Sequence, residues 1–140
     1  MVSKQELKAG FSVAKAKAFY AATGKEIALA EFTNPRGQFV RGEQYIFVLD
    51  LNGIMLAHGM NHFFVGKDFS GVKDTDGKEF IQEILHMAKE KGAGWTEYMW
   101  SDPVTKKSLP KALYFEKVDD MIICCGTYKD VLGSREVELL

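Results

Sequence analysis

The sequence contains no apolar run close to the roughly 18 to 20 residues that a membrane-spanning helix needs. Its first residues, Met1 to Lys8, also lack the basic stretch followed by an apolar stretch that is typical of a secretion signal. We therefore expect that this chain contains no membrane span and that a secretion signal or membrane anchor is absent from it.

Charge of one sign is not in excess. The 18 Lys and Arg residues nearly balance the 19 Asp and Glu residues, the formal net charge is −1, and the basic residues do not cluster. Because nucleic-acid binding depends on concentrated positive charge, we expect no nucleic-acid partner. The length of 140 residues, with 46% hydrophobic and 26% charged residues, fits one globular domain.

Cysteine is scarce, since Cys124 and Cys125 are the only two and are adjacent. Neighbouring residues of a strand point to opposite faces, so a disulfide between them would need a strained backbone. We interpret both as buried thiols, which taken alone weakly favour a reducing compartment.

Motifs that carry catalysis are missing. There is no G-x-S-x-G elbow, and neither cysteine has a histidine nearby in the sequence. Gly92-Ala93-Gly94 follows a predicted helix and precedes a strand, the reverse of the order that binds phosphate, so it predicts a turn. We expect no enzyme activity and no cofactor, while a triad assembled only by the fold is left open.

Metal sites have no better support. His58 and His62 are four residues apart, but a strand predicted to end at Ala57 removes the helical geometry that would bring them together. The segments Asp50–Gly53 and Asp74–Gly77 resemble the opening of a calcium loop but lack its closing glutamate. Both segments predict turns.

The amino-terminal part of the sequence is helical in pattern. From Ser3 to Phe32 apolar residues recur near helical spacing, with Gly24 as the one interruption. This predicts a helical segment over residues 1–32, either one long broken helix or two consecutive helices. The segment Asn34–Gly37, with its proline and glycine, ends it.

Strand patterns dominate the remainder. Gln44–Leu49 and Ile54–Ala57 flank turn residues and predict a hairpin, and the glycine-punctuated segment His58–Val72 predicts a loop with a short helical piece. Asp76, three residues before Glu79, resembles a capping box and predicts a helix from about Gly77 to Lys91. Three strand-like runs follow: Trp95–Trp100, Ala112–Val118 and Met121–Tyr128. This order predicts an α+β fold, one five-stranded antiparallel sheet with helices on one side.

Polar-tipped side chains gather on the later strands. Tyr98 and Trp100 share a face of one strand, Lys111 and Tyr114 lie around the start of the next, and His58 leaves an earlier one. A lysine beside hydroxyls in an aromatic wall is what a carboxylate pocket needs. The alternative is that the aromatic residues only pack the sheet and Lys111 is solvated. Lys111 and Tyr114 also have opposite parity, so sharing a face would require a bulge or a late strand start.

A series of blocks along the chain resembles a single Cache domain of type 2. Each block is weak alone, but their order is specific and covers about Lys4 to Lys129. The blocks are Tyr45–Gly53, Met55–His58, Val65–Asp68, Asp76–Ile81, Gly94–Trp100, Pro103–Thr105, Pro110–Lys111 with Tyr114, and Gly126–Tyr128.

The resemblance implies one domain over residues 1–140, with a long helical segment at 1–32, a five-stranded PAS-like sheet and a carboxyl-terminal tail at 130–140. It implies extracytoplasmic sensing, periplasmic or secreted, in chemotaxis or sensor-kinase signalling, and this outweighs the compartment that the thiols favour. It further implies a small organic anion as ligand, such as acetate, propionate, pyruvate or lactate. The implied ligand-binding residues are His58, Tyr98, Trp100, Lys111 and Tyr114.

Two other functions remain open from the sequence. One is a protein-interaction or dimerisation module without a functional pocket, in which the amino-terminal helix pairs with a partner or with a second copy of the chain. The other is an enzyme or metal protein built on the same fold.

Overall fold

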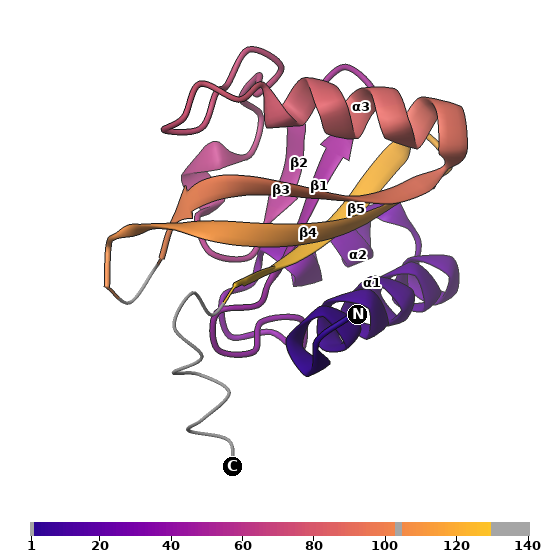
Figure 1. The fold of residues 1–140 in the computed structure, drawn as a ribbon. Coiled ribbons are helices and arrows are strands. Elements are labelled where there is room, and N and C mark those ends of the chain that lie inside the picture. Colours follow the sequence, from indigo (N-terminus) through magenta and orange to yellow (C-terminus); the bar gives the residue numbers. More distant parts are fainter. Residues whose placement is uncertain (1, 103–104, 130–140) are drawn as a thin grey trace.

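A computed structural model describes residues 2–102 and 105–129. Two helices come first, then a hairpin, a short 3-10 helix, a third helix and three strands (Figure 1). Their bounds are α1 (Lys4–Thr23), α2 (Lys25–Thr33), β1 (Ile46–Asp50), β2 (Met55–His58), η1 (His62–Phe64), α3 (Phe80–Lys91), β3 (Ala93–Ser101), β4 (Ser108–Val118) and β5 (Met121–Tyr128). The expected tail at 130–140, and most of the block Pro103–Thr105, lie outside the described residues.

The five strands form one sheet in the order β2-β1-β5-β4-β3, and each neighbouring pair is antiparallel. The predicted α+β fold with a five-stranded antiparallel sheet is thereby confirmed. The centre of the sheet is the β1–β5 pair, in which Phe47 lies opposite Cys124. The first strand of the sequence, β1, is thus paired with the last of the described strands, β5.

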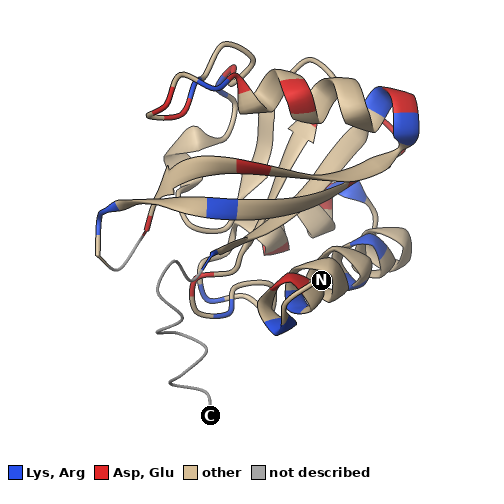
Figure 2. Cartoon of the chain, viewed as in Figure 1, with Lys and Arg blue, Asp and Glu red and all other residues tan. Residues whose placement is uncertain are grey.

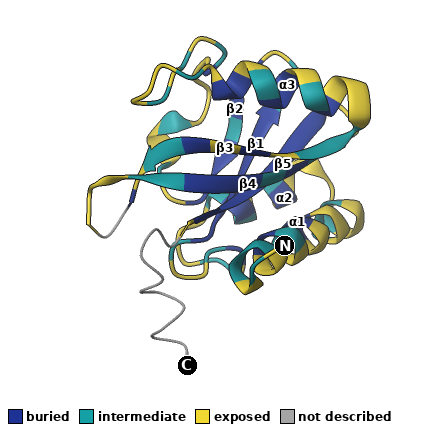
Figure 3. Ribbon diagram, in the orientation of Figure 1, coloured by how far each residue is buried: buried dark blue, intermediate teal, exposed yellow. Residues whose placement is uncertain are grey.

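Helices cover both faces of the sheet, so the prediction of helices on one side is wrong. Helices α1 and α2 pack on one face, and α3 packs on the other (Figure 1). Ile46 and Val48 point into the α1–α2 core, while Phe47 and Leu49 point into the α3 core. A strand buried on both faces needs apolar residues at every position rather than at alternate ones. Figure 3 shows the resulting buried centre and exposed helix surfaces.

The amino-terminal segment is two helices, which decides between the two alternatives. Ser3 begins α1 with a capping box, in which its hydroxyl accepts from the Glu6 backbone N–H (3.1 Å) and its own N–H donates to the Glu6 carboxylate (3.0 Å). Gly24 separates α1 from α2 with a φ of +89°, a conformation that favours glycine.

Helix α3 begins at Phe80, so the predicted start near Gly77 is wrong. The preceding residues are held in a turn by Asp74, whose Oδ1 accepts from the backbone N–H of Asp76 (2.9 Å) and of Lys78 (2.8 Å). Glu79 is the N-cap residue and makes no side-chain capping bond. The aspartate that shapes this turn is therefore Asp74, two residues before Asp76, which the sequence pattern indicated.

Charge is spread over the described surface. Figure 2 shows basic and acidic residues interspersed on helices and loops, with few on the sheet. Among the described residues, no helix combines the length and apolarity needed to cross a membrane.

Candidate functional site

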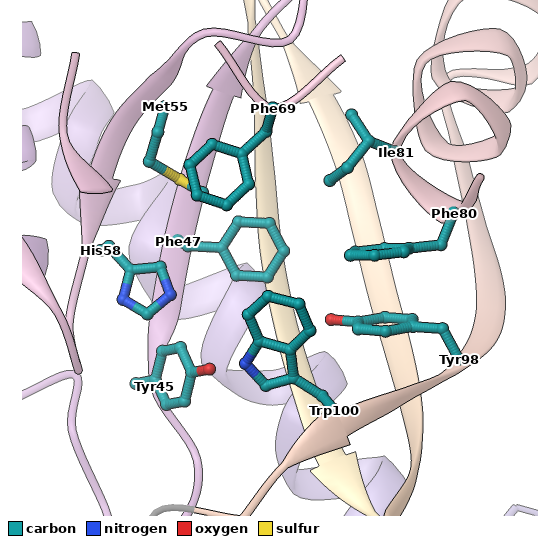
Figure 4. A pocket seen from close by; sticks show the side chains of 9 residues that line it. All are labelled: Tyr45, Phe47, Met55, His58, Phe69, Phe80, Ile81, Tyr98 and Trp100. Atoms are coloured by element: carbon teal, nitrogen blue, oxygen red, sulfur yellow. The ribbon is translucent and has the colours of Figure 1, made fainter. Parts of the chain in front are cut away.

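A pocket lies on the α3 face of the sheet, between the hairpin, the start of α3 and the end of β3. Figure 4 shows its walls, which are mainly aromatic. The lining residues are Tyr45, Phe47, Met55, His58, Phe69, Phe80, Ile81, Tyr98 and Trp100. Three residues implied by the family resemblance, His58, Tyr98 and Trp100, are therefore brought together.

A bulge in β2 aims His58 at this pocket. Val48 pairs with Ala57 and Leu49 pairs with Met55, so Leu56 is an extra residue on β2. In a regular strand Met55 and Ala57 would share a face, and His58 would point toward α2. The bulge shifts this alternation by one residue, so that Met55 and His58 both face the pocket.

His58 is held as a neutral hydrogen-bond donor. Its Nδ1 accepts from the backbone N–H of Asn61 (2.9 Å) and of Met60 (3.2 Å), so that nitrogen carries no proton. Burial, and secondarily the nearby charge of Lys111, lower the pKa of His58 to about 3. The remaining proton is on Nε2, which is left as a donor for a bound group.

Lys111 supplies a buried positive charge beside the pocket. Its side chain is 1% exposed, and its ammonium donates to the hydroxyl of Tyr45 at 3.0 Å. The ammonium also lies 4.4 Å from the ring centre of Tyr45 and 5.4 Å from that of Tyr128. Within the part of the chain that the structure describes, no carboxylate forms an ion pair with it. A buried cation of this kind favours an anion as ligand.

Tyr114, the fifth implied site residue, lies on the opposite face of the sheet. It packs against the α1–α2 core, its ring centre is 5.1 Å from that of Trp95, and its hydroxyl donates to Glu116 at 2.9 Å. Burial, together with that hydrogen bond, raises the pKa of Tyr114 to about 12. The register of β4 with β5 runs without a bulge through this region, so the opposite parity of Lys111 and Tyr114 keeps them on opposite faces.

Tyr45 takes the place that the sequence reasoning gave to Tyr114. Figure 4 shows the hydroxyls of Tyr45 and Tyr98 pointing into the pocket from opposite sides, with the indole nitrogen of Trp100 between them. The sequence pattern that indicates this position is the alternation of Tyr45, Phe47 and Leu49, which places all three side chains on the α3 face of the sheet. The tyrosine precedes β1 and is far from Lys111 in sequence, so pairing the two required the sheet order.

The aromatic wall is tightly stacked. Phe80 and Tyr98 lie face to face with ring centres 4.0 Å apart, and Trp100 meets Phe80 edge-on at 5.7 Å. Burial raises the pKa of Tyr98 well above its ordinary value, so its hydroxyl stays a donor. The cavity is about 10 Å³, about the space that one water needs. An acid larger than water would enter only with movement of a wall side chain.

Other chemistry has little support in the described residues. No three His, Cys, Asp or Glu side chains within residues 2–102 and 105–129 are placed to hold a metal ion. The segment beginning at Asp50 is a turn, as predicted, in which its Oδ1 accepts from two backbone N–H groups. Cys124 and Cys125 are buried free thiols on opposite faces of β5, and burial raises the pKa of Cys125 to about 11.

Comparison with known proteins places these features in a family context. The family model described as Single Cache domain 2 matches residues 9–137. Methyl-accepting chemotaxis protein McpP of Pseudomonas putida is 29% identical over 90 residues, which are 63% of this chain and 16% of that protein. Sensor histidine kinase MctS of Rhizobium johnstonii is 30% identical over 88 residues, 61% of this chain and 19% of that protein. The aligned part is thus less than a fifth of either relative.

Solved structures with the same fold include sensor domains. A Cache chemosensory domain described for its carboxylic acid recognition has a TM-score of 0.69 and 26% identity, covering 89% of this chain and 88% of that one. A periplasmic sensor domain of a chemotaxis protein has a TM-score of 0.68 and 25% identity, with coverages of 86% and 88%. A methyl-accepting chemotaxis protein of Vibrio parahaemolyticus reaches 0.71 at 25% identity, with coverages of 86% and 82%.

Proposed function

Because the chain belongs to the Single Cache domain 2 family, we propose that it is a sensor domain that binds a small organic monocarboxylate. The observation that carries the proposal is the buried ammonium of Lys111, which contacts a tyrosine hydroxyl and pairs with no carboxylate of the described residues. A cation buried in this way is stabilised by an anionic ligand. The similar Cache domain described for carboxylic acid recognition supports the same ligand class.

The pocket provides separate partners for the two ends of such a ligand. Lys111 pairs with the carboxylate, and the hydroxyls of Tyr45 and Tyr98 and the Nε2–H of His58 donate to its oxygens. The aromatic and aliphatic side chains, such as Phe80 and Ile81, enclose the tail. An acid of about four to six heavy atoms buries little area, so a dissociation constant of about micromolar to millimolar is expected.

Entry of the ligand requires the wall to move, and Trp100 is the side chain best placed to do so. It is only partly buried and lies at the end of β3, whereas Phe80 and Tyr98 are 2% and 5% exposed. Outward rotation of the indole would open the cavity without breaking the Phe80–Tyr98 stack. Closure of the wall around the ligand would then favour one conformation of the domain, as sensing requires.

The same geometry supports binding without turnover. His58 has its Nδ1 occupied and its pKa held at about 3, so it is a poor general base at neutral pH. The thiols of Cys124 and Cys125 are buried with raised pKa values and are poor nucleophiles. The chain as a whole would act outside the cytoplasm, periplasmic or secreted, in chemotaxis or sensor-kinase signalling, as the periplasmic domain with the same fold suggests.

The experiment that tests the ligand class is a thermal-shift screen of the purified domain against acetate, propionate, pyruvate, lactate and their amides. A ligand at a hundred times its dissociation constant stabilises by about 2.7 kcal/mol, which gives a clear rise in melting temperature. We expect at least one acid to raise the melting temperature and its amide to have no effect. An unchanged melting temperature with every acid, and no co-purified acid by mass spectrometry, would contradict the proposal.

Self-association through α1 is a second candidate function, compatible with the first. Phe11 and Leu7 on the outer face of α1 are 67% and 51% exposed. With the exposed Ala14 and Ala18 they form an apolar stripe at the alternating four-and-three spacing of a helix pair. We expect sedimentation to show a dimer that Phe11→Glu dissociates, and a monomer at all concentrations would contradict this.

A further inference from the structure

Three consecutive residues just before β1 contact three different parts of the domain. The Tyr45 hydroxyl accepts from Lys111 at 3.0 Å beside the pocket. The side-chain amide of Gln44 donates to the backbone carbonyl of Gln5, in the first turn of α1, at 2.9 Å. Glu43 accepts from β5, where its carboxylate bonds the Thr127 hydroxyl at 2.7 Å and the Tyr128 backbone N–H at 2.9 Å.

We propose that the segment Glu43–Tyr45 couples the Lys111 ammonium to the first turn of α1 and to the end of β5. Where the ammonium moves, Tyr45 moves with it, and the two neighbouring side chains transmit that movement to two places at once. That a carboxylate ligand is what moves the ammonium rests on the proposed function. The coupling itself is a property of the protein alone.

The local backbone makes these residues move together. Arg41 and Gln44 exchange two backbone hydrogen bonds, of 2.8 and 2.9 Å, across a tight turn with Gly42 at a φ of +60°. From Ile46 onward the chain is fixed in β1 between β2 and β5. The segment is therefore a short, stiff link, in which a shift of Tyr45 is not absorbed by a flexible loop.

Alternation along the extended chain explains the division of contacts. Tyr45 points to the α3 face, where the pocket lies, and Gln44 points to the α1 face. Gln44 is 8% exposed, so its bond to the Gln5 carbonyl is shielded from competing water. The adjacent residues Gln44 and Tyr45 therefore connect the two faces of the sheet, so that the pocket on one face is linked to α1 on the other.

Lys111 also approaches the β5 end directly, which closes a ring of contacts. Its ammonium lies 5.4 Å from the ring centre of Tyr128, whose backbone N–H is bonded to Glu43. Withdrawal of the ammonium from Tyr45 therefore changes the surroundings of both ends of the Glu43–Tyr45 segment. The hydrogen bond of Gln44 links this segment to the first turn of α1, and the hydrogen bonds of Glu43 link it to the end of β5.

The test needs no ligand, because Lys111→Met removes the ammonium while it keeps the length of the side chain. Hydrogen exchange is measured at Glu6 and Leu7, whose amides are bonded within the first turn of α1, and at Tyr128. We expect exchange at these amides to rise about three- to tenfold, the equivalent of one lost hydrogen bond. Tyr45→Phe breaks the same link from the other side and is expected to give the same pattern.

Two further backgrounds separate the routes. In Gln44→Met, Lys111→Met should no longer alter exchange at Glu6 and Leu7 but should still alter it at Tyr128. In Glu43→Gln, Lys111→Met should still alter exchange at Glu6 and Leu7, and its effect at Tyr128 should be smaller, because only the direct approach of the ammonium to the Tyr128 ring remains. Gln82→Met is the matched control, since the Gln82 amide donates to the Ser70 carbonyl at 2.8 Å, in a loop away from α1, and the full response should persist.

The proposal is overturned if Lys111→Met and Tyr45→Phe both leave exchange at Glu6 and Leu7 unchanged, or if the response survives Gln44→Met. Coupling requires that the effects of the paired substitutions on hydrogen exchange are not additive. The location of a residue between two sites is not by itself evidence that it couples them. Failure of every acid in the thermal-shift screen to bind would contradict the proposed function alone. Propionate that binds the wild type without altering these amides would overturn the coupling alone.

Discussion

The side chain of Lys111 lies across β5 directly over Gly126. A Cβ atom on Gly126 would stand 2.5 Å from the Cε atom of Lys111, much closer than side chains tolerate. Gly126 does not have a positive φ, so the backbone conformation does not require glycine there. The space above Gly126 is what lets the ammonium travel from β4 to Tyr45.

Replacement of that glycine should displace the lysine. Gly126→Ala is expected to destabilise the domain by about 1–3 kcal/mol through overpacking and to weaken acid binding. Chemical denaturation measures the first effect and calorimetric titration the second. Gly71→Ala is the control, because a Cβ there meets nothing within 4 Å and it should leave both unchanged. A neutral Gly126→Ala would show that the lysine has another path to the pocket.

Stability should fall in mild acid because of His58. Its pKa is about 3 in the folded domain and about 6.5 when unfolded, so only the unfolded chain takes up the proton as the pH drops below 6.5. The contribution of neutral, buried His58 to the free energy of unfolding is therefore fully present above pH 6.5 and is lost as the pH falls toward 3. The loss is about 2 kcal/mol between pH 7 and 5. His58→Gln should reduce this slope, while His86→Gln, on the exposed face of α3, should not. Equal slopes in the wild type and His58→Gln would contradict the assignment.

Two tyrosines make a matched pair for the site. Tyr45→Phe removes the hydroxyl that contacts Lys111 and should weaken acid binding about three- to tenfold. Tyr114→Phe removes a hydroxyl bonded to Glu116 on the other face and should leave binding unchanged. Calorimetric titration of both variants measures the difference. If Tyr114→Phe weakened binding more than Tyr45→Phe, the acid would bind on the α1–α2 face of the sheet, and the pocket on the α3 face would not be the binding site.

Ligand length should depend on Trp100. Trp100→Phe enlarges the pocket next to Phe80, and each additional buried methylene of the ligand contributes about 0.8 kcal/mol, or about fourfold in affinity. We expect the preference of the variant to move from acetate or propionate toward butyrate, measured by competition. Trp95→Phe, on the opposite face beside Tyr114, is the control that should keep the original preference.

The strands could be predicted from the sequence because their signals are local. Met121–Tyr128 has the predicted bounds, and the hairpin and the three later strands were all expected. The second helical layer was missed because continuous burial of β1 and β5 resembles an ordinary apolar strand until its neighbours are known. The start of α3 was misplaced because Asp74 and Asp76 are both aspartates in turn sequences, and only the hydrogen bonds show which one shapes the turn.

The site was partly predictable for the same reason. Tyr98 and Trp100 share a face by simple alternation, but His58 reaches the pocket through a bulge that alternation cannot foresee. The parity of Tyr114 already argued against its place in the pocket, and the unbroken register of β4 shows why. Tyr45 is 66 residues from Lys111 in sequence, so their contact depends on the order of strands across the sheet.

A calorimetric titration of wild type and Lys111→Met with propionate and with propionamide tests most directly whether the Lys111 ammonium binds a carboxylate. These ligands have nearly the same shape and differ in charge, and Lys89→Met serves as the control for loss of an exposed lysine. We predict that propionate binds the wild type and Lys89→Met equally, that its affinity for Lys111→Met is about tenfold to a hundredfold lower, and that propionamide binds none of the three proteins. Equal binding of propionate to Lys111→Met, or of propionamide to the wild type, would contradict it.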